Sequence, residues 1–208
     1  MKVAIVVFEG FEELDALGPY AVFTYARDGG ADVEVALVTA EPAQRVTAQH
    51  GLVVVPHGTL DDSYQLVVVP GGGWLDRGEV GLFAEAKRGV LPSAVARVHE
   101  RGATVGSVCT GALLLAASGL LRGRPAVTHH GALAELAASG AEVIRERVVD
   151  DDDVVTAGGV TAGIDLSLWL VEREWGSELA EWIAQLMEHE RVGGVWRRAR
   201  EVPQIGAE

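Results

Sequence analysis

The only cysteine of the chain, Cys109, lies between a strand-like and a helix-like segment. Residues 104–108 before it have the pattern of a buried strand, and residues 112–117 after it have that of a helix. Small residues flank the junction, as in a nucleophile elbow, where a strained strand-to-helix turn pushes one side chain into a cleft. Because the N-terminus of the following helix favours a thiolate, we expect Cys109 to be a reactive nucleophile at neutral pH rather than a structural residue.

Asp15 is the predicted proton partner of this cysteine. It lies in sequence between Leu14 and Leu17, which mark the buried face of a helix-like segment. A carboxyl group held against a thiolate has its pKa raised by the like charge and by desolvation. It can then carry a proton at neutral pH and donate it to a substrate atom. We expect the neighbouring Glu12 and Glu13 to be solvated acids that complement the helix dipole.

Two further features belong to the same predicted site. Glycines 71–73 follow an apolar run, so the Gly72 amide, together with the N–H of Thr110, can stabilise a developing negative charge. His129 ends a short strand and is the leading base candidate among six histidines, although its sequence position does not place it against Cys109. No metal-ligand spacing stands out, and we expect neither a metal nor a cofactor.

The segments that must position these residues alternate between strand and helix. Such alternation predicts one α/β domain, residues 1–208, with a mostly parallel sheet sandwiched between helices. Ligands bind at the carboxyl ends of parallel strands, where the cysteine turn, the glycine run and the loop before Asp15 are expected to meet. The predicted strands are residues 3–8, 33–38, 53–55, 66–69, 104–108, 126–129 and 154–157. The predicted helices are residues 11–27, 83–101 and 112–117, with a long closing helix within 164–191.

Composition restricts the classes of partner. The formal net charge of −13 argues against a nucleic-acid partner, because phosphate binding needs clustered Lys and Arg. No apolar run reaches the roughly 18 residues of a membrane span, and no signal peptide is recognised, so a cytoplasmic location is predicted. We expect the acidic run at residues 150–153 to be a solvated hairpin tip.

Together these motifs resemble the ThiJ/PfpI superfamily, which is class I glutamine amidotransferase-like and has a flavodoxin-type fold. The resemblance spans nearly the whole chain. It rests on Phe11-Glu12-Glu13-Leu14-Asp15, Val69-Pro70-Gly71-Gly72, Val108-Cys109-Thr110-Gly111-Ala112, Val127-Thr128-His129 and Thr156-Ala157-Gly158-Gly159-Val160-Thr161-Ala162-Gly163-Ile164-Asp165.

Within the superfamily, Asp15 in Leu-Asp-x-x-Gly-Pro and Thr110 after the cysteine resemble the isonitrile hydratase-like branch. The protease branch carries Cys-His at the elbow, whereas Thr110 stands at that second position here. Deglycase and glyoxalase relatives carry glutamate where Asp15 stands. Related transcriptional regulators carry an added helix-turn-helix module, for which we expect no room after the closing helix. His129 matches a histidine found near the nucleophile in several branches.

The resemblance implies a homodimer. Four of the five tryptophans lie between Trp169 and Trp196, and they fit either a dimer interface or the core of one chain.

The implied function is a cofactor-independent hydro-lyase that converts a small isonitrile to an N-substituted formamide through a cysteine thioimidate. Cys109 would attack the isonitrile carbon, Asp15 would protonate it, and the Thr110 hydroxyl would assist positioning. The amides of Gly72 and Thr110 would face the reacting group. Two alternatives stay open: a glyoxalase or deglycase acting on 2-oxoaldehydes, and a non-enzymatic oxidation sensor built on an exposed cysteine of low pKa.

Overall fold

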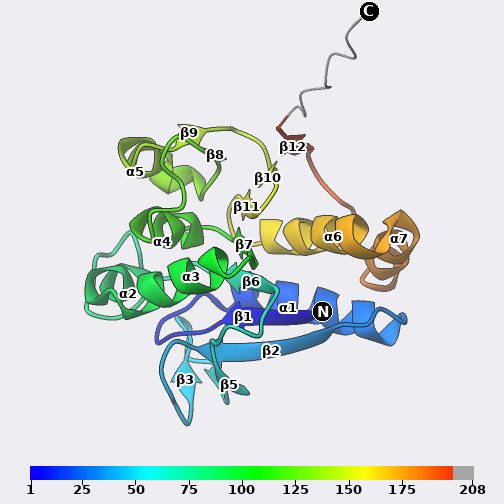
Figure 1. Cartoon of the computed structure of the whole chain (residues 1–208), viewed down its shortest axis with the longest axis horizontal. Helices are drawn as coiled ribbons and strands as arrows, with labels where there is room; N and C mark the ends of the chain where they lie inside the picture. The colour runs from blue at the N-terminus through cyan, green and yellow to red at the C-terminus, as the bar shows by residue number, and fades with distance from the viewer. Residues whose placement is uncertain (199–208) are drawn as a thin grey trace, which may run out of the picture.

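A central eight-stranded sheet organises the computed structural model, which describes residues 1–198 (Figure 1). The strand order is β12-β10-β11-β7-β6-β1-β2-β5, and neighbouring strands are parallel except for the β10–β11 pair. The predicted, mostly parallel sheet is therefore confirmed. The strands are β1 (Lys2–Val6), β2 (Glu34–Thr39), β5 (Gly58–Thr59), β6 (Leu66–Val69), β7 (Thr104–Ser107), β10 (Val148–Asp151), β11 (Val154–Ala157) and β12 (Val195–Arg197). The last ten residues of the predicted domain, 199–208, lie outside the described residues.

Helices flank this sheet in two packed groups. One group is α1 (Glu13–Asp28), α6 (Ala162–Trp175) and α7 (Ser177–Leu186). The other is α2 (Leu82–Arg88), α3 (Val90–Glu100) and α4 (Gly111–Ala117), with α5 (Leu133–Ala138) and the 3₁₀ turn η1 (His130–Ala132) beside α4. Two small pairs lie apart from the main sheet: β3 (Val46–Thr47) with β4 (Val53–Val54), and β8 (Pro125–Ala126) with β9 (Glu142–Val143). All four residues of β6 are buried, as expected for a strand covered on both faces.

Glycines end two helices earlier than predicted. The helix predicted at residues 83–101 is divided into α2 and α3 at Gly89, whose φ of 78° is the left-handed conformation that terminates helices. Pro92 does not kink α3, because it lies in the first turn, where its missing N–H has no helical partner to lose. Gly176, with φ 99°, likewise separates α6 from α7. The strand predicted at residues 126–129 is only the short β8.

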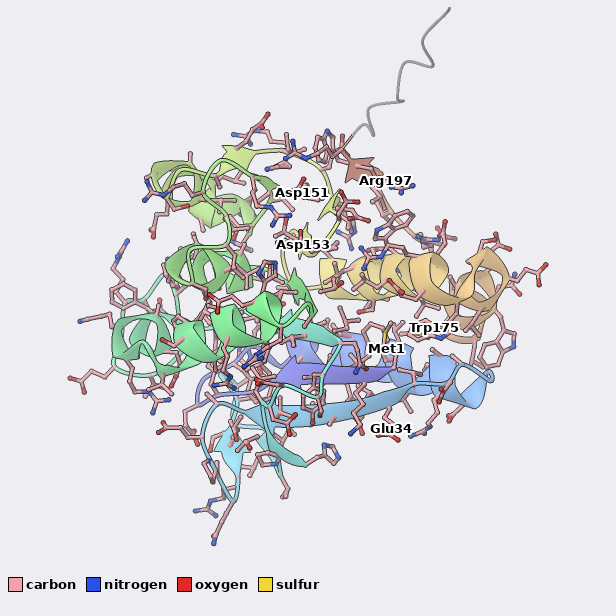
Figure 2. All side chains as sticks on the ribbon, viewed as in Figure 1. Met1, Glu34, Asp151, Asp153, Trp175 and Arg197 are labelled. Atoms are coloured by element: carbon pink, nitrogen blue, oxygen red, sulfur yellow. The ribbon has the colours of Figure 1, made fainter. Side chains whose placement is uncertain are left out.

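The acidic run lies at a hairpin tip as predicted, but only Asp152 and Asp153 are exposed there. Asp150 and Asp151 are each only 4% exposed, because β12 pairs with the outer edge of β10 and α6 covers it. Asp151 forms ion pairs with Arg124 and Arg198. Figure 2 shows Asp151 and Asp153 at this hairpin and Arg197 on the neighbouring strand β12, where it is paired in register with Asp150. The described residues contain no helix long and apolar enough to cross a membrane.

Asp150 should be a measurable source of stability. Its carboxylate accepts hydrogen bonds from the Trp169 indole at 2.8 Å and the Asp152 backbone N–H at 2.9 Å, and it pairs with Arg173 at 3.5 Å. Asp150→Ala leaves these donors without an acceptor in a largely buried site, so we expect the free energy of unfolding to fall by about 3 kcal/mol. Urea unfolding monitored by circular dichroism measures this loss.

The matched control is Asp28→Ala, which removes an ion pair with Arg27 in which both side chains are about half exposed. That variant should lose less than about 1 kcal/mol. Equal losses in the two variants would show that the buried aspartate contributes no more than a surface one.

Candidate active site

Cys109 occupies a strained turn between β7 and α4. Its φ of 57° lies in the left-handed region, which residues other than glycine rarely adopt. The Cys109 N–H donates to the Gly158 carbonyl at 2.8 Å, and the Thr128 hydroxyl donates to the Cys109 carbonyl at 2.7 Å. Gly111 is needed beside it, because a Cβ there would lie 2.2 Å from the carbonyl oxygen of Val69. This is the geometry expected of a nucleophile elbow.

Backbone amides approach the sulfur from two separate loops. The N–H groups of Val160 and Thr110 both form hydrogen-bonding interactions with the Cys109 thiol that favour its charged form. Val160 was not among the predicted site residues, although it lies in a glycine-rich stretch that carried the family resemblance. Its contribution comes from its backbone, so its side-chain type gave no signal of this role. Its φ of 39° is unusual for a β-branched residue and marks a second strained position at the site.

Asp15 is completely buried beside this cysteine. Its Oδ2 accepts a hydrogen bond from the Gly71 N–H at 2.8 Å, whereas the buried Oδ1 has no such partner within residues 1–198. Burial raises the pKa of Asp15 to about 8, and the nearby Glu12 carboxylate adds to the rise, while the Gly71 N–H and the Cys109 thiol oppose it. The carboxyl therefore holds a proton at neutral pH, in the direction that the sequence predicted.

The thiol does not ionise as readily as predicted. Burial raises the pKa of Cys109 to about 12, the charge of Asp15 adds to the rise once that carboxyl group ionises above about pH 8, and the Val160 and Thr110 amides oppose it. The side chain is only 7% exposed, and the helix dipole and the two amides do not offset this desolvation. Burial thus favours a thiol beside a carboxylic acid at neutral pH, which is the opposite direction to the thiolate that we predicted.

Glu12 also has a larger role than predicted. Its side chain accepts a hydrogen bond from the Asp15 N–H at 2.8 Å, which caps the start of α1, and it lines the same cavity as Cys109. Glu13 instead pairs with His50 at 2.7 Å. The described part of the chain contains one group of three side chains that could together hold a metal ion, with the candidate ligand atoms within 4.8 Å of one another: Glu12, Glu13 and His50.

The glycine run holds Thr110 and Asp15 in place rather than offering a free anion site. The Gly72 N–H donates to the Thr110 hydroxyl oxygen at 3.3 Å, so it is not the free donor that we predicted. At Gly71, an added Cβ would lie 2.5 Å from that hydroxyl oxygen and 2.9 Å from Asp15 Oδ2. Only glycine therefore allows both side chains to approach this loop. The Val160 amide, not that of Gly72, accompanies the Thr110 amide at the sulfur.

His129 lines the cavity, but its hydrogen bonding does not suit a base. Its Nδ1 accepts from the Gly131 N–H at 3.1 Å, so the neutral ring carries its proton on Nε2. Burial lowers the pKa of His129, which keeps the ring neutral. Within the described residues it forms no hydrogen bond with Cys109. In this arrangement the ring can donate a hydrogen bond into the cavity but has no free lone pair with which to accept a proton.

The cavity above the sulfur has a volume of about 280 Å³. Trp74, Leu75 and the Val160 side of the turn give it apolar lining, whereas Gln49 and Asp76 are polar contributors. The Trp74 indole donates to Glu135 at 2.8 Å and packs edge-on against Phe83, which ties this wall to neighbouring helices. The site therefore combines a cysteine thiol, a buried carboxyl group with a raised pKa and a cavity with a partly apolar lining.

Comparisons with known proteins identify the family of the chain. The model of the DJ-1/PfpI family matches residues 1–173. Isonitrile hydratase of Pseudomonas putida is 33% identical over 193 residues, which cover 91% of this chain and 78% of that protein. Protein DJ-1 homolog A of Arabidopsis thaliana is 32% identical over 190 residues, which cover 89% of this chain but only 46% of that protein.

A solved structure shows the same fold. The crystal structure of a ThiJ/PfpI family protein from Pseudomonas syringae superposes with a TM-score of 0.80 and 27% sequence identity, covering 99% of this chain and 78% of that one. The family match and the similarity of sequence and structure lead to one conclusion. The chain belongs to the DJ-1/PfpI family.

Proposed function

We propose that this protein hydrates a small isonitrile to an N-substituted formamide at Cys109. The observation that carries the proposal is the buried Asp15 carboxyl group, which holds a proton beside the thiol and whose Oδ1 has no hydrogen-bond partner among residues 1–198. An isonitrile must receive a proton and a nucleophile at the same terminal carbon. A neutral thiol–carboxylic acid pair supplies both without a separate charged reagent. The similarity to a relative named isonitrile hydratase gives independent support.

In the first step, Asp15 transfers its proton to the terminal carbon while the sulfur of Cys109 attacks the same atom. A C–H and a C–S bond form, and the thiol proton passes to the Asp15 carboxylate. The product is a thioimidate, R–N=CH–S, on Cys109. Negative charge that develops on the sulfur faces the amides of Val160 and Thr110, which are fixed before the reaction begins.

In the second step, water adds to the thioimidate carbon while Asp15 protonates the nitrogen and recovers a proton from that water. The resulting R–NH–CH(OH)–S intermediate loses its C–S bond, and the hydroxyl proton returns to the sulfur. This releases the formamide R–NH–CHO and restores both the thiol and the carboxylic acid. The Thr110 hydroxyl, oriented by the Gly72 amide, lines the cavity where the water must approach.

The alternatives receive less support from the site. An oxidation sensor needs an accessible cysteine of low pKa, whereas Cys109 is 7% exposed and its pKa is raised. Oxoaldehyde chemistry also begins with attack by sulfur, so the elbow alone does not separate it from isonitrile hydration. A substrate panel that includes methylglyoxal separates the two activities.

Cys109 and Asp15 should both be required for turnover. With cyclohexyl isocyanide as substrate and the formamide identified by mass, Cys109→Ala should remove detectable activity. Asp15→Asn should reduce kcat by about 10²- to 10⁴-fold, because it removes the general acid. Asp28→Asn, a change at an exposed aspartate, serves as the matched control and should turn over normally.

Two results would contradict the proposal. Full formamide production by a folded Cys109→Ala variant would exclude the mechanism. Cysteine-dependent loss of methylglyoxal, without formamide production from the isonitrile, would favour the oxoaldehyde activity instead.

The pH dependence should report the Asp15 proton. Because the acid form is the reactive one, kcat should be level at pH 6–7 and should fall about tenfold per unit above the Asp15 pKa of about 8. A reaction limited by thiolate formation has the opposite pH dependence, because its kcat rises with pH. A kcat profile that increases steadily from pH 6 to 9 would therefore contradict the assignment of Asp15 as general acid.

A further inference from the structure

We propose that Arg147 is a positioning residue for the nucleophile. Its hydrogen bonds hold the turn at residues 158–161 in place, so that the Val160 amide stays directed at the sulfur of Cys109. The inference concerns the reactivity of the sulfur itself. It goes beyond the proposed function and holds whichever electrophile is the substrate.

The turn at residues 158–161 contacts the nucleophile twice. The carbonyl of Gly158 accepts the Cys109 N–H at 2.8 Å, and the N–H of Val160 faces the sulfur. The first contact holds the strained elbow backbone, and the second favours negative charge on the side chain. A shift of this turn would therefore alter both the conformation of Cys109 and the ease with which it ionises.

The turn itself is strained and needs external support. Val160 has φ 39°, and a β-branched residue keeps such a conformation only where surrounding contacts hold it. On one side, the ring of His129 packs so closely on Gly159 that an added Cβ would lie 2.7 Å from its Cδ2. Hydrogen bonds within the first turn of α6 hold the other end, including Gly163 N–H to the Val160 carbonyl at 3.2 Å.

Arg147 forms hydrogen bonds with the turn on both sides of Val160. Its carbonyl accepts the Gly158 N–H at 3.0 Å, and its Nη2 donates to the Thr161 hydroxyl at 3.1 Å. Its Nε donates to Asp165 Oδ2 at 2.6 Å, where α6 begins. One residue thus connects the residues before and after Val160 to the helix that follows them.

Asp165, which accepts the hydrogen bond from Arg147 Nε, is itself fixed by its surroundings. Asp165 is only 5% exposed, and its second oxygen, Oδ1, contacts His189 Nε2 at 3.0 Å. The backbone beside Arg147 is also close-packed, because a Cβ at Gly193 would lie 3.0 Å from the Arg147 Cβ. Charge-assisted hydrogen bonds in a partly buried position of this kind orient a guanidinium group more firmly than surface pairs do.

Alkylation of the protein by iodoacetamide tests the proposal without any isonitrile. Because Cys109 is the only cysteine, mass spectrometry of the full chain reports this one sulfur, and second-order rates are measured from pH 7 to 10. Arg147→Met should slow alkylation about five- to tenfold at fixed pH. Its pH–rate profile should therefore be shifted to higher pH by up to about one unit. Thr161→Val, which removes the hydrogen bond from Arg147 to the Thr161 hydroxyl, should shift the pH–rate profile in the same direction by a smaller amount.

Arg173→Met is the matched control. Arg173 is similarly buried and paired with Asp150, but it lies near the other end of α6 and reaches Thr104 at the start of β7. It should lower thermal stability, as Arg147→Met does, but leave the alkylation profile unchanged. Arg147→Lys, which keeps the charge without the forked geometry, should recover only part of the rate.

The proposal is overturned if folded Arg147→Met alkylates within twofold of the wild type at every pH, or if Arg173→Met shifts the profile equally. If Arg147→Met does not fold, Thr161→Val decides: an unchanged profile then overturns the proposal, and an upward displacement supports it. Failure of the isonitrile assay would leave these alkylation results intact, so the two proposals are tested separately.

Discussion

The burial of Asp15 against Cys109 is the interaction on which the rest of the site depends. Asp15 has no exposed surface, and one of its oxygens lacks a hydrogen-bond partner in the described part of the chain, so the carboxyl group is most stable when it keeps its proton. The same desolvation favours the neutral form of the adjacent thiol. The close approach is possible because Gly71 has no side chain between Asp15 and Thr110. The proposed reaction accordingly uses a neutral acid–thiol pair whose charge develops only as substrate reacts.

Two strained backbone positions surround this pair, and the sheet brings them together. Cys109 follows β7 and Val160 follows β11, and these strands are parallel neighbours, so both turns lie at the same edge. Each turn is supported by hydrogen bonds to the other or to adjacent loops, including Cys109 N–H to Gly158 and the Thr128 hydroxyl to the Cys109 carbonyl. The strain is local, and it directs two backbone amides at one sulfur atom.

Local sequence patterns were sufficient to predict the main features of the fold and the place of Cys109, because a buried strand that runs into small residues and a helix is recognisable in consecutive residues. Asp15 was found in the same way, from its position between apolar helix residues. The contribution of Val160 was missed because a backbone amide far along the chain leaves no side-chain signal. The buried state of Asp150 depends on β12 and on Arg173 of α6, which no local pattern connects to it. The direction of the Cys109 pKa was predicted wrongly because the cost of burial depends on tertiary packing that the sequence motif does not quantify.

The proposed mechanism requires that Asp15 carry a proton at neutral pH. The most direct measurement is the infrared difference spectrum between the wild-type protein and Asp15→Asn, recorded from pH 6 to 10. We expect a C=O band of a protonated carboxylic acid at pH 6–7, present only in the wild type, that is replaced by carboxylate bands as the pH rises through about 8. Carboxylate bands assigned to Asp15 already at pH 6 would exclude the proposed mechanism, because the site would then lack the proton that the reaction uses.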